Sequence, residues 1–263
     1  MVRRPLGNHH VGPDTLLVTS DTTRTGATTA PTEELRKLLT PVRYVLWDLD
    51  GPICRLFAGH PAVDVARELV NLIQERGLGG LLREEERLDP DPQAVLLGVN
   101  ERHPESDLIA LLEEWLTQQE LIAVPSAMPT PYVDPLIRTW SALGARFAIT
   151  TNNSALAATA YVESRGLKSC FPYVYGRTKD LDQMKPDPHC LSQALKALGA
   201  DPSHALMLGD ARTDYEAAQK LDVPFLGYAR NQRKLDLLVA AGVKPSHIVR
   251  SMEEVLAALK AMS

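Results

Sequence analysis

YVLWDLDGPIC, residues 44–54, runs four bulky apolar residues directly into two aspartates, Asp48 and Asp50. The apolar run from Tyr44 to Trp47 is typical of a buried strand. A carboxylate at the end of a buried strand costs free energy unless a cation or hydrogen-bond donors pair with it. The rest of the chain must therefore bring partners to these two carboxylates.

Short apolar runs alternate with amphipathic stretches from residue 42 onward. We predict strands within residues 42–48, 145–151, 172–176, 204–210, 223–229 and 247–250. We predict helices within residues 154–166, 188–199, 213–222 and 232–242, with a short one over 32–39. Continuously apolar strands separated by helices favour an α/β fold, a Rossmann-like parallel sheet flanked by helices. In such a fold the ligand site lies at the carboxyl ends of the strands, which is where Asp48 and Asp50 fall.

The alternation is interrupted between the first and second predicted strands, where roughly ninety residues replace an ordinary crossover. Residues 62–77 and 105–122 carry apolar side chains at helical spacing, and the Pro and Asp residues around 89–92 mark a turn. We therefore predict an inserted all-helical cap domain over residues 58–128. A core domain would comprise residues 32–57 and 129–263. An insertion at this point would lie over the strand ends as a lid.

The composition argues against two classes of partner. A net charge of −5 and a pI of about 5.8 disfavour binding to nucleic acid or to an anionic membrane. No apolar run approaches the ~18 residues of a membrane span, and Leu16 to Val18 is too short for a signal-peptide core. The three cysteines lack metal-site spacing and indicate reduced thiols in a cytoplasmic protein. Residues 1–31 lack periodicity, which predicts a disordered tail.

Polar residues follow the predicted strands or lie in the loops behind them: Asp48 and Asp50, Thr151 and Asn152, Lys185, and Asp210 and Asp214. Four carboxylates in one cleft repel one another, and a single lysine cannot neutralise them. A hard divalent cation such as Mg²⁺ suits oxygen ligands. A cleft that holds Mg²⁺, an ammonium and a hydroxyl suits a phosphoryl group, toward which a carboxylate is a competent nucleophile.

Four short motifs occur in a fixed order: DLDGP at 48–52, TTN at 150–152, KPDP at 185–188 and GDARTD at 209–214. In these motifs the chain resembles the haloacid dehalogenase-like hydrolase superfamily, of the kind with a helical C1-type cap after the first motif. The resemblance covers residues 42–260 and includes the segments that lead into the second and third motifs.

The resemblance implies a role for each motif residue. Asp48 would be the nucleophile and a metal ligand. Asp50 would be the general acid and then the base for the hydrolytic water, and it would also offer its backbone carbonyl to the metal. Thr151, aided by Asn152, would hydrogen-bond the transferring phosphoryl group. Lys185 would hold the nucleophile and the phosphoryl oxygens.

Three further residues complete the expected site. Asp210 would bind the metal and Asp214 would orient the metal ligands. Asp214 also fits a carboxylate that favours the N-terminus of the helix behind it, and both interpretations can hold together. Arg55 could face the substrate under the cap, or it could be an ordinary solvated arginine.

Asp50 favours the phosphatase branch, because superfamily members that cleave carbon–halogen bonds lack this second aspartate. We therefore predict a Mg²⁺-dependent phosphatase of a small phosphorylated metabolite, acting through an aspartyl-phosphate, as a monomer or homodimer. Two alternatives stay open: a phosphotransferase or sugar-phosphate mutase on the same fold, and a non-catalytic protein that binds a phosphate ester. A phosphonate-cleaving enzyme would need a cap lysine, and residues 58–128 contain none.

Overall fold

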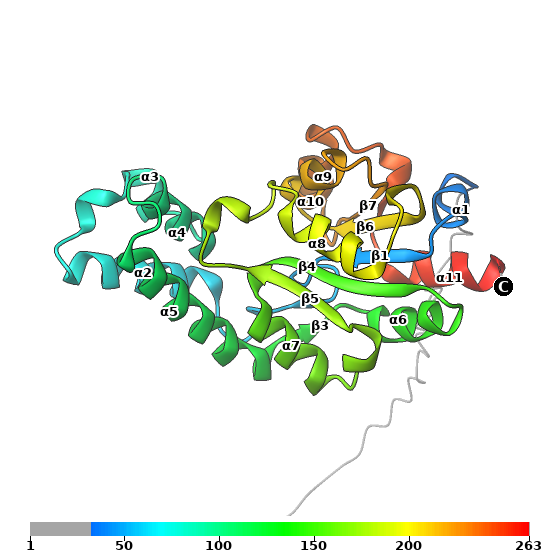
Figure 1. Cartoon of the computed structure of the whole chain (residues 1–263), viewed down its shortest axis with the longest axis horizontal. Helices are drawn as coiled ribbons and strands as arrows, with labels where there is room; N and C mark the ends of the chain where they lie inside the picture. The colour runs from blue at the N-terminus through cyan, green and yellow to red at the C-terminus, as the bar shows by residue number, and fades with distance from the viewer. Residues whose placement is uncertain (1–32, 263) are drawn as a thin grey trace, which may run out of the picture.

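The computed structural model of the chain describes residues 33–262 (Figure 1). The tail predicted for residues 1–31 lies outside the described residues. The short helix predicted over residues 32–39 is present as α1 (Glu33–Leu39). Within the described range, no helix combines the length and the apolarity that crossing a bilayer requires.

Six parallel strands form the central sheet, in the order β5-β4-β1-β6-β7-β8. Each overlaps a predicted strand, and their bounds are β1 Tyr44–Trp47, β4 Arg146–Ser154, β5 Tyr173–Arg177, β6 Ala205–Gly209, β7 Phe225–Tyr228 and β8 Ile248–Val249. Strand β1 is central, since Trp47 is in register with Ile149 of β4 on one side and Leu208 of β6 on the other. The strand order reverses beside β1, and α/β folds bind ligands at such a switch point.

Helices cover both faces of this sheet (Figure 1). One face carries α1, α6 (Val133–Ala142), α7 (Ala155–Ser164) and α11 (Met252–Met262), and the other carries α8 (His189–Leu198), α9 (Arg212–Gln219) and α10 (Gln232–Ala240). Side chains alternate along a strand, so Val45 and Trp47 join the first apolar cluster while Leu46 joins the second. Because both faces are buried, the strand needs a continuous apolar run. The predicted α/β fold class is confirmed.

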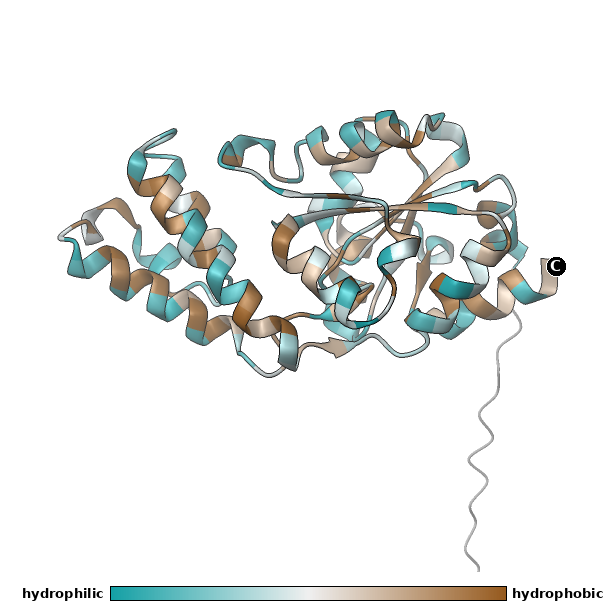
Figure 2. Ribbon diagram, turned by 60° about the horizontal axis from the view of Figure 1, so that its bottom comes forward, coloured by the Kyte–Doolittle hydropathy of each residue, from teal (hydrophilic) through white to brown (hydrophobic). Residues whose placement is uncertain are grey.

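The long insertion folds as a group of helices with an apolar core of its own. The helices are α2 (Ala62–Glu75), α3 (Glu84–Arg87), α4 (Pro92–Asn100) and α5 (Asp107–Ala123). Figure 1 shows them beside one end of the sheet, and in Figure 2 apolar and polar residues alternate along them, as amphipathic helices require. Their apolar cluster also takes in Leu181 and Met184, which belong to the loop that carries Lys185.

Two features of the insertion were not predicted. The chain enters and leaves it through an antiparallel pair, β2 (Cys54–Arg55) with β3 (Met128–Pro129), and strands of two residues are too short to show periodicity. Helix α4 begins directly behind the predicted turn at 89–92. Asp91 is its N-cap, with Oδ1 accepting the backbone N–H of Gln93 at 2.9 Å.

Candidate active site

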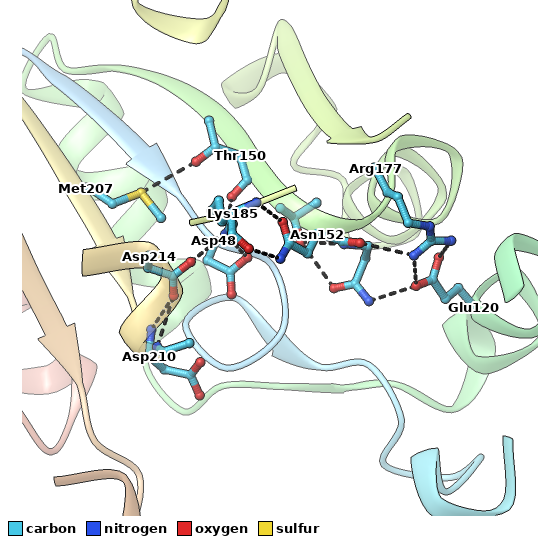
Figure 3. Close-up of polar contacts among 12 residues, drawn as sticks. Asp48, Glu120, Thr150, Asn152, Arg177, Lys185, Met207, Asp210 and Asp214 are labelled. Carbon is cyan, nitrogen blue, oxygen red and sulfur yellow. Dashed lines mark hydrogen bonds and ion pairs between the residues drawn. The ribbon is translucent and has the colours of Figure 1, made fainter. Parts of the chain in front are cut away.

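The ammonium group of Lys185 lies at the centre of the site, at the carboxyl end of β1 (Figure 3). Its Nζ donates to Asp48 Oδ1 at 2.9 Å, to Asp214 Oδ1 at 2.5 Å and to the carbonyl oxygen of Thr150 at 2.8 Å. An ammonium has three N–H groups, so all three are engaged. Lys185 thus gives the buried Asp48 a partner from 137 positions further along the chain.

Burial and pairing act in opposite directions on the pKa values of Asp48 and Lys185. Desolvation raises the pKa of Asp48 to about 7, and the ammonium of Lys185 limits that rise. For Lys185, desolvation lowers the pKa, but the carboxylates of Asp214 and Asp48 outweigh it and the pKa is raised. Lys185 therefore stays charged, and a further cation beside Asp48 would favour the carboxylate form of Asp48.

Asp50 has different partners from Asp48. Its Oδ1 accepts the backbone N–H of Leu56 at 2.9 Å. Burial raises the pKa of Asp50 to about 6, against the lowering effect of that N–H group. A carboxyl group with such a pKa can give up a proton in one step and accept one in another, as a general acid–base must.

Asp214 caps helix α9 from within its first turn. Its Oδ2 accepts the backbone N–H groups of Asp210 and Ala211, both at 3.0 Å. Its other oxygen binds Lys185, so both carboxylate oxygens are engaged. Asp214 therefore caps the helix and contacts Lys185 at the same time, and its expected role in orienting the metal ligands stays a prediction.

Lys234 is a site residue that the sequence analysis did not identify. Its Nζ lies 2.8 Å from Asp210 Oδ2 and 3.3 Å from the carbonyl oxygen of Asp210. Burial raises the pKa of Asp210 to about 6, and Lys234 opposes the rise. Lys234 comes from the first turn of α10, where the sequence shows only a lysine on an amphipathic helix. No local signal distinguishes it from a solvated side chain.

The acidic residues of the site fit a divalent cation. Carboxylate oxygens of Asp48, Asp210 and Asp214 lie within 4.8 Å of one another, and all three residues are buried. Hard oxygen ligands of this kind suit Mg²⁺. Gly51 leaves room for them: its φ is 120°, and a Cβ there would lie 2.4 Å from Asp210 Oδ2. The carboxylate of Asp50 is not among these three, and the expected use of its backbone carbonyl stays a prediction.

Thr151 and Asn152 lie near the end of β4 and border the site. The buried Thr151 hydroxyl donates to Asn153 Oδ1 at 3.1 Å. The side chain of Asn152 clamps the backbone of Lys185: its Oδ1 accepts the Lys185 N–H at 2.8 Å, and its Nδ2 donates to the Lys185 carbonyl at 3.0 Å. This geometry makes Asn152 a positioning residue for Lys185, and its contact with a phosphoryl group stays a prediction.

A cavity of about 300 Å³ brings these residues together. From the sheet side it is lined by Asp48, Asp50, Thr151, Asn152, Lys185, Asp210, Asp214 and Lys234. From the insertion it is lined by Ala62, Pro90, Asp91, Pro92 and Gln93. Arg55 is the predicted site residue that the structure does not bring into this cavity. Its exposed side chain lies against Met128, with Nη2 2.9 Å from Sδ, in a different hollow of the surface.

Known proteins resemble this chain in sequence and in fold. A family profile described as haloacid dehalogenase-like hydrolase matches residues 42–222. A phosphoglycolate phosphatase of Mesorhizobium japonicum is 32% identical over 96 residues, which cover 36% of this chain and 42% of that protein. One of Aquifex aeolicus is 25% identical over 230 residues, covering 81% of this chain and 97% of that protein.

Solved structures show the same fold. A haloacid dehalogenase-like hydrolase of Streptococcus pneumoniae superposes with a TM-score of 0.58 and 18% identity, over 83% of this chain and 98% of that one. At this identity the likeness concerns the fold alone. The matched segment spans less than half the length of the Mesorhizobium relative.

Proposed function

Because the chain belongs to the haloacid dehalogenase-like hydrolase family, we propose that it is a Mg²⁺-dependent phosphatase of a small phosphorylated metabolite. One observation carries the proposal: Asp48, paired with Lys185, and Asp50, which accepts the backbone N–H of Leu56, line the same cavity. The relatives named as phosphoglycolate phosphatases support the reaction class. We also propose that residues 58–128 act as the cap of this site, since they contribute to the cavity.

In the first step the carboxylate of Asp48 attacks phosphorus and forms an aspartyl-phosphate. Lys185 holds Asp48 at the strand end through its 2.9 Å contact. The carboxyl group of Asp50 donates its proton to the oxygen of the leaving alcohol. Thr151 lines the same cavity, and its hydroxyl, which donates to Asn153 Oδ1 in this structure, would turn to donate to the transferring group.

In the second step water hydrolyses the aspartyl-phosphate. Asp50 is now ionised and takes a proton from that water, which regenerates the acid form for the next cycle. Asn152 keeps Lys185 in place through both steps, because its amide binds the Lys185 backbone at two points.

Asp48 and Asp210 would hold the Mg²⁺, and Asp214 would orient Asp210 through the backbone N–H of Asp210. When bound, Mg²⁺ would neutralise charge on the phosphoryl oxygens during transfer. Lys234 already offsets the negative charge of Asp210, so a bound cation has less negative charge to balance.

The reaction is tested with p-nitrophenyl phosphate. We expect hydrolysis that EDTA abolishes and excess Mg²⁺ restores, and we expect none from Asp48→Asn. Asp64→Asn is the matched control, since Asp64 lies on the surface of α2 and pairs with Arg67. Activity that survives EDTA or Asp48→Asn contradicts the proposal.

The same assay separates the alternative transferase. A phosphotransferase or mutase returns the phosphoryl group to a second hydroxyl instead of water. With a hexose 1-phosphate as substrate, the phosphatase releases free phosphate, whereas a mutase yields an isomer. Tight binding of phosphate esters without any product would identify a non-catalytic protein.

We also propose a cytoplasmic location and a small assembly for this protein. The three cysteines, Cys54, Cys170 and Cys190, are free, which suits the reducing cytoplasm. A monomer or a homodimer remains the expected assembly, and light scattering of the purified protein measures it.

A further inference from the structure

The active-site cavity has two ends of different character. The sheet end carries the groups proposed to act on phosphorus. The cap end is formed by the turn before α4 and the first residues of that helix, Pro90, Asp91, Pro92 and Gln93. A phosphate ester held at the sheet end would direct its leaving alcohol toward this cap end, so these residues face the part of the substrate that differs between phosphate esters.

Asp91 places a negative charge at the cap end. One carboxylate oxygen, Oδ1, is fixed by the backbone N–H of Gln93 at 2.9 Å. The second oxygen has no hydrogen-bond donor among residues 33–262, and the residue is exposed at the cavity wall. Desolvation raises the pKa of Asp91, the backbone N–H of Gln93 lowers it, the Asp89 carboxylate raises it and the ammonium of Lys234 lowers it, so Lys234 of the sheet end is one of the charges that act on this carboxylate.

No uncommitted cation of the described chain lines the cavity to balance that charge. The cationic residues in its wall are Lys185 and Lys234. Lys185 has all three N–H groups engaged, and Lys234 is paired with Asp210. A carboxylate on the leaving group would therefore face the like charge of Asp91 with no unpaired cationic side chain in the cavity wall, which is unfavourable. A hydroxyl would find an acceptor in Asp91 and both a donor and an acceptor in the side-chain amide of Gln93.

We infer that Asp91 and Gln93 form a leaving-group subsite that accepts uncharged, hydroxyl-bearing phosphate monoesters and rejects carboxylate-bearing ones. The inference rests on the proposed phosphatase function. It sets this chain apart from relatives that are named phosphoglycolate phosphatases, because phosphoglycolate carries a carboxylate in this position.

Three two-carbon esters test the inference, since they differ only in the terminal group. They are 2-hydroxyethyl phosphate, phosphoglycolate and phosphoethanolamine, which end in a hydroxyl, a carboxylate and an ammonium. We expect kcat/KM for 2-hydroxyethyl phosphate to exceed that for phosphoglycolate by about tenfold or more, since juxtaposed like charges are costly. Equal or better turnover of phosphoglycolate overturns the inference and leaves the phosphatase function intact. Faster turnover of phosphoethanolamine than of 2-hydroxyethyl phosphate also overturns it, because the subsite would then select a cation.

The variant Asp91→Asn isolates the charge. Asparagine is as good an N-cap as aspartate, so α4 keeps its start. We expect the preference for 2-hydroxyethyl phosphate to fall to about threefold or less, mainly through a gain on phosphoglycolate. Asp107→Asn is the matched control: Asp107 is exposed in the first turn of α5 and does not line the cavity. An unchanged preference in Asp91→Asn overturns the inference. Absence of turnover of every ester by the unsubstituted protein, p-nitrophenyl phosphate included, overturns the proposed function as well.

Discussion

Asp48 and Asp50 are two positions apart in one loop, yet different neighbours hold their carboxylates. Asp48 Oδ1 accepts a hydrogen bond from the ammonium of Lys185 at 2.9 Å. Asp50 receives a single backbone N–H, and burial raises its pKa to about 6. Burial raises the pKa of Asp48 as well, to about 7, so the contact with Lys185, and not the pKa, supports Asp48 as the proposed nucleophile.

The variant Asp50→Asn tests the proton-donor role through the leaving group. We expect kcat for 2-hydroxyethyl phosphate to fall by about 100-fold or more, because an alkoxide needs a proton as it leaves. p-Nitrophenolate leaves as a stable anion without a proton, so kcat for p-nitrophenyl phosphate should fall much less. The asparagine side-chain oxygen can still accept the Leu56 N–H, which keeps the loop in place. Steady-state kcat for both esters is the measurement, and an equal loss on the two would contradict a role in protonation.

Lys234 shows where prediction from single residues fails. Asp48 and Asp210 directly follow apolar strands, and Thr151 lies near the end of another; that local pattern made them predictable. Lys234 comes from a helix after β7, and only the folded chain shows that it contacts Asp210. Arg55 illustrates the converse, because nearness in sequence to Asp50 did not bring its side chain into the cavity.

A buried ion pair connects helix α5 of the insertion to strands β4 and β5 of the sheet (Figure 3). Glu120 accepts Arg177 Nη1 at 2.9 Å and Nη2 at 3.1 Å, and both side chains are fully buried. The same carboxylate accepts the side-chain amide of Asn153 at 3.0 Å, and Asn153 in turn accepts the hydroxyl of Thr151. The network therefore runs from the insertion to a residue that lines the active-site cavity.

Glu120→Gln should destabilise the protein strongly. It leaves the guanidinium of Arg177 buried with less compensating charge, and breaking such a pair costs about 3 kcal/mol in the free energy of unfolding. The matched control is Glu163→Gln, because Glu163 pairs with Lys168 at the surface and both side chains are half exposed. Surface pairs contribute about 0 to 1 kcal/mol. Urea unfolding of both variants measures the difference, and similar midpoints for the two would refute a stabilising role for the buried pair.

The strands and most helices were predictable because their periodicity is local. β1 needed only four consecutive apolar residues to be identified, and α2 showed its buried face at helical spacing. The Glu120–Arg177 pair joins residues 57 positions apart on two different elements, and nothing in either segment indicates the other. Pairing across the insertion is set by tertiary packing, which the sequence pattern does not display.

In the molecule as a whole, the helical insertion and the parallel sheet form the two walls of one cavity. The sequence predicted a helical insertion, because an interruption of roughly ninety residues exceeds any ordinary crossover. It did not indicate which residues of the insertion would line the cavity. Asp91 and Gln93 lie at a turn and a helix start, where polar residues are ordinary caps.

Mg²⁺ binding should stabilise the whole fold, because the carboxylates of Asp48, Asp210 and Asp214 come together only in the native state. A ligand that binds only the folded chain adds RT ln(1 + [L]/Kd), about 1.4 kcal/mol at ten times Kd. For a chain of this length that raises Tm by about 4 °C. Thermal unfolding with Mg²⁺, with EDTA and with NaCl of equal ionic strength measures the shift. Asp210→Asn removes one of the three carboxylates and should abolish most of the increase. An increase that persists in this variant, or that NaCl reproduces, would place the stabilising effect of Mg²⁺ outside this site.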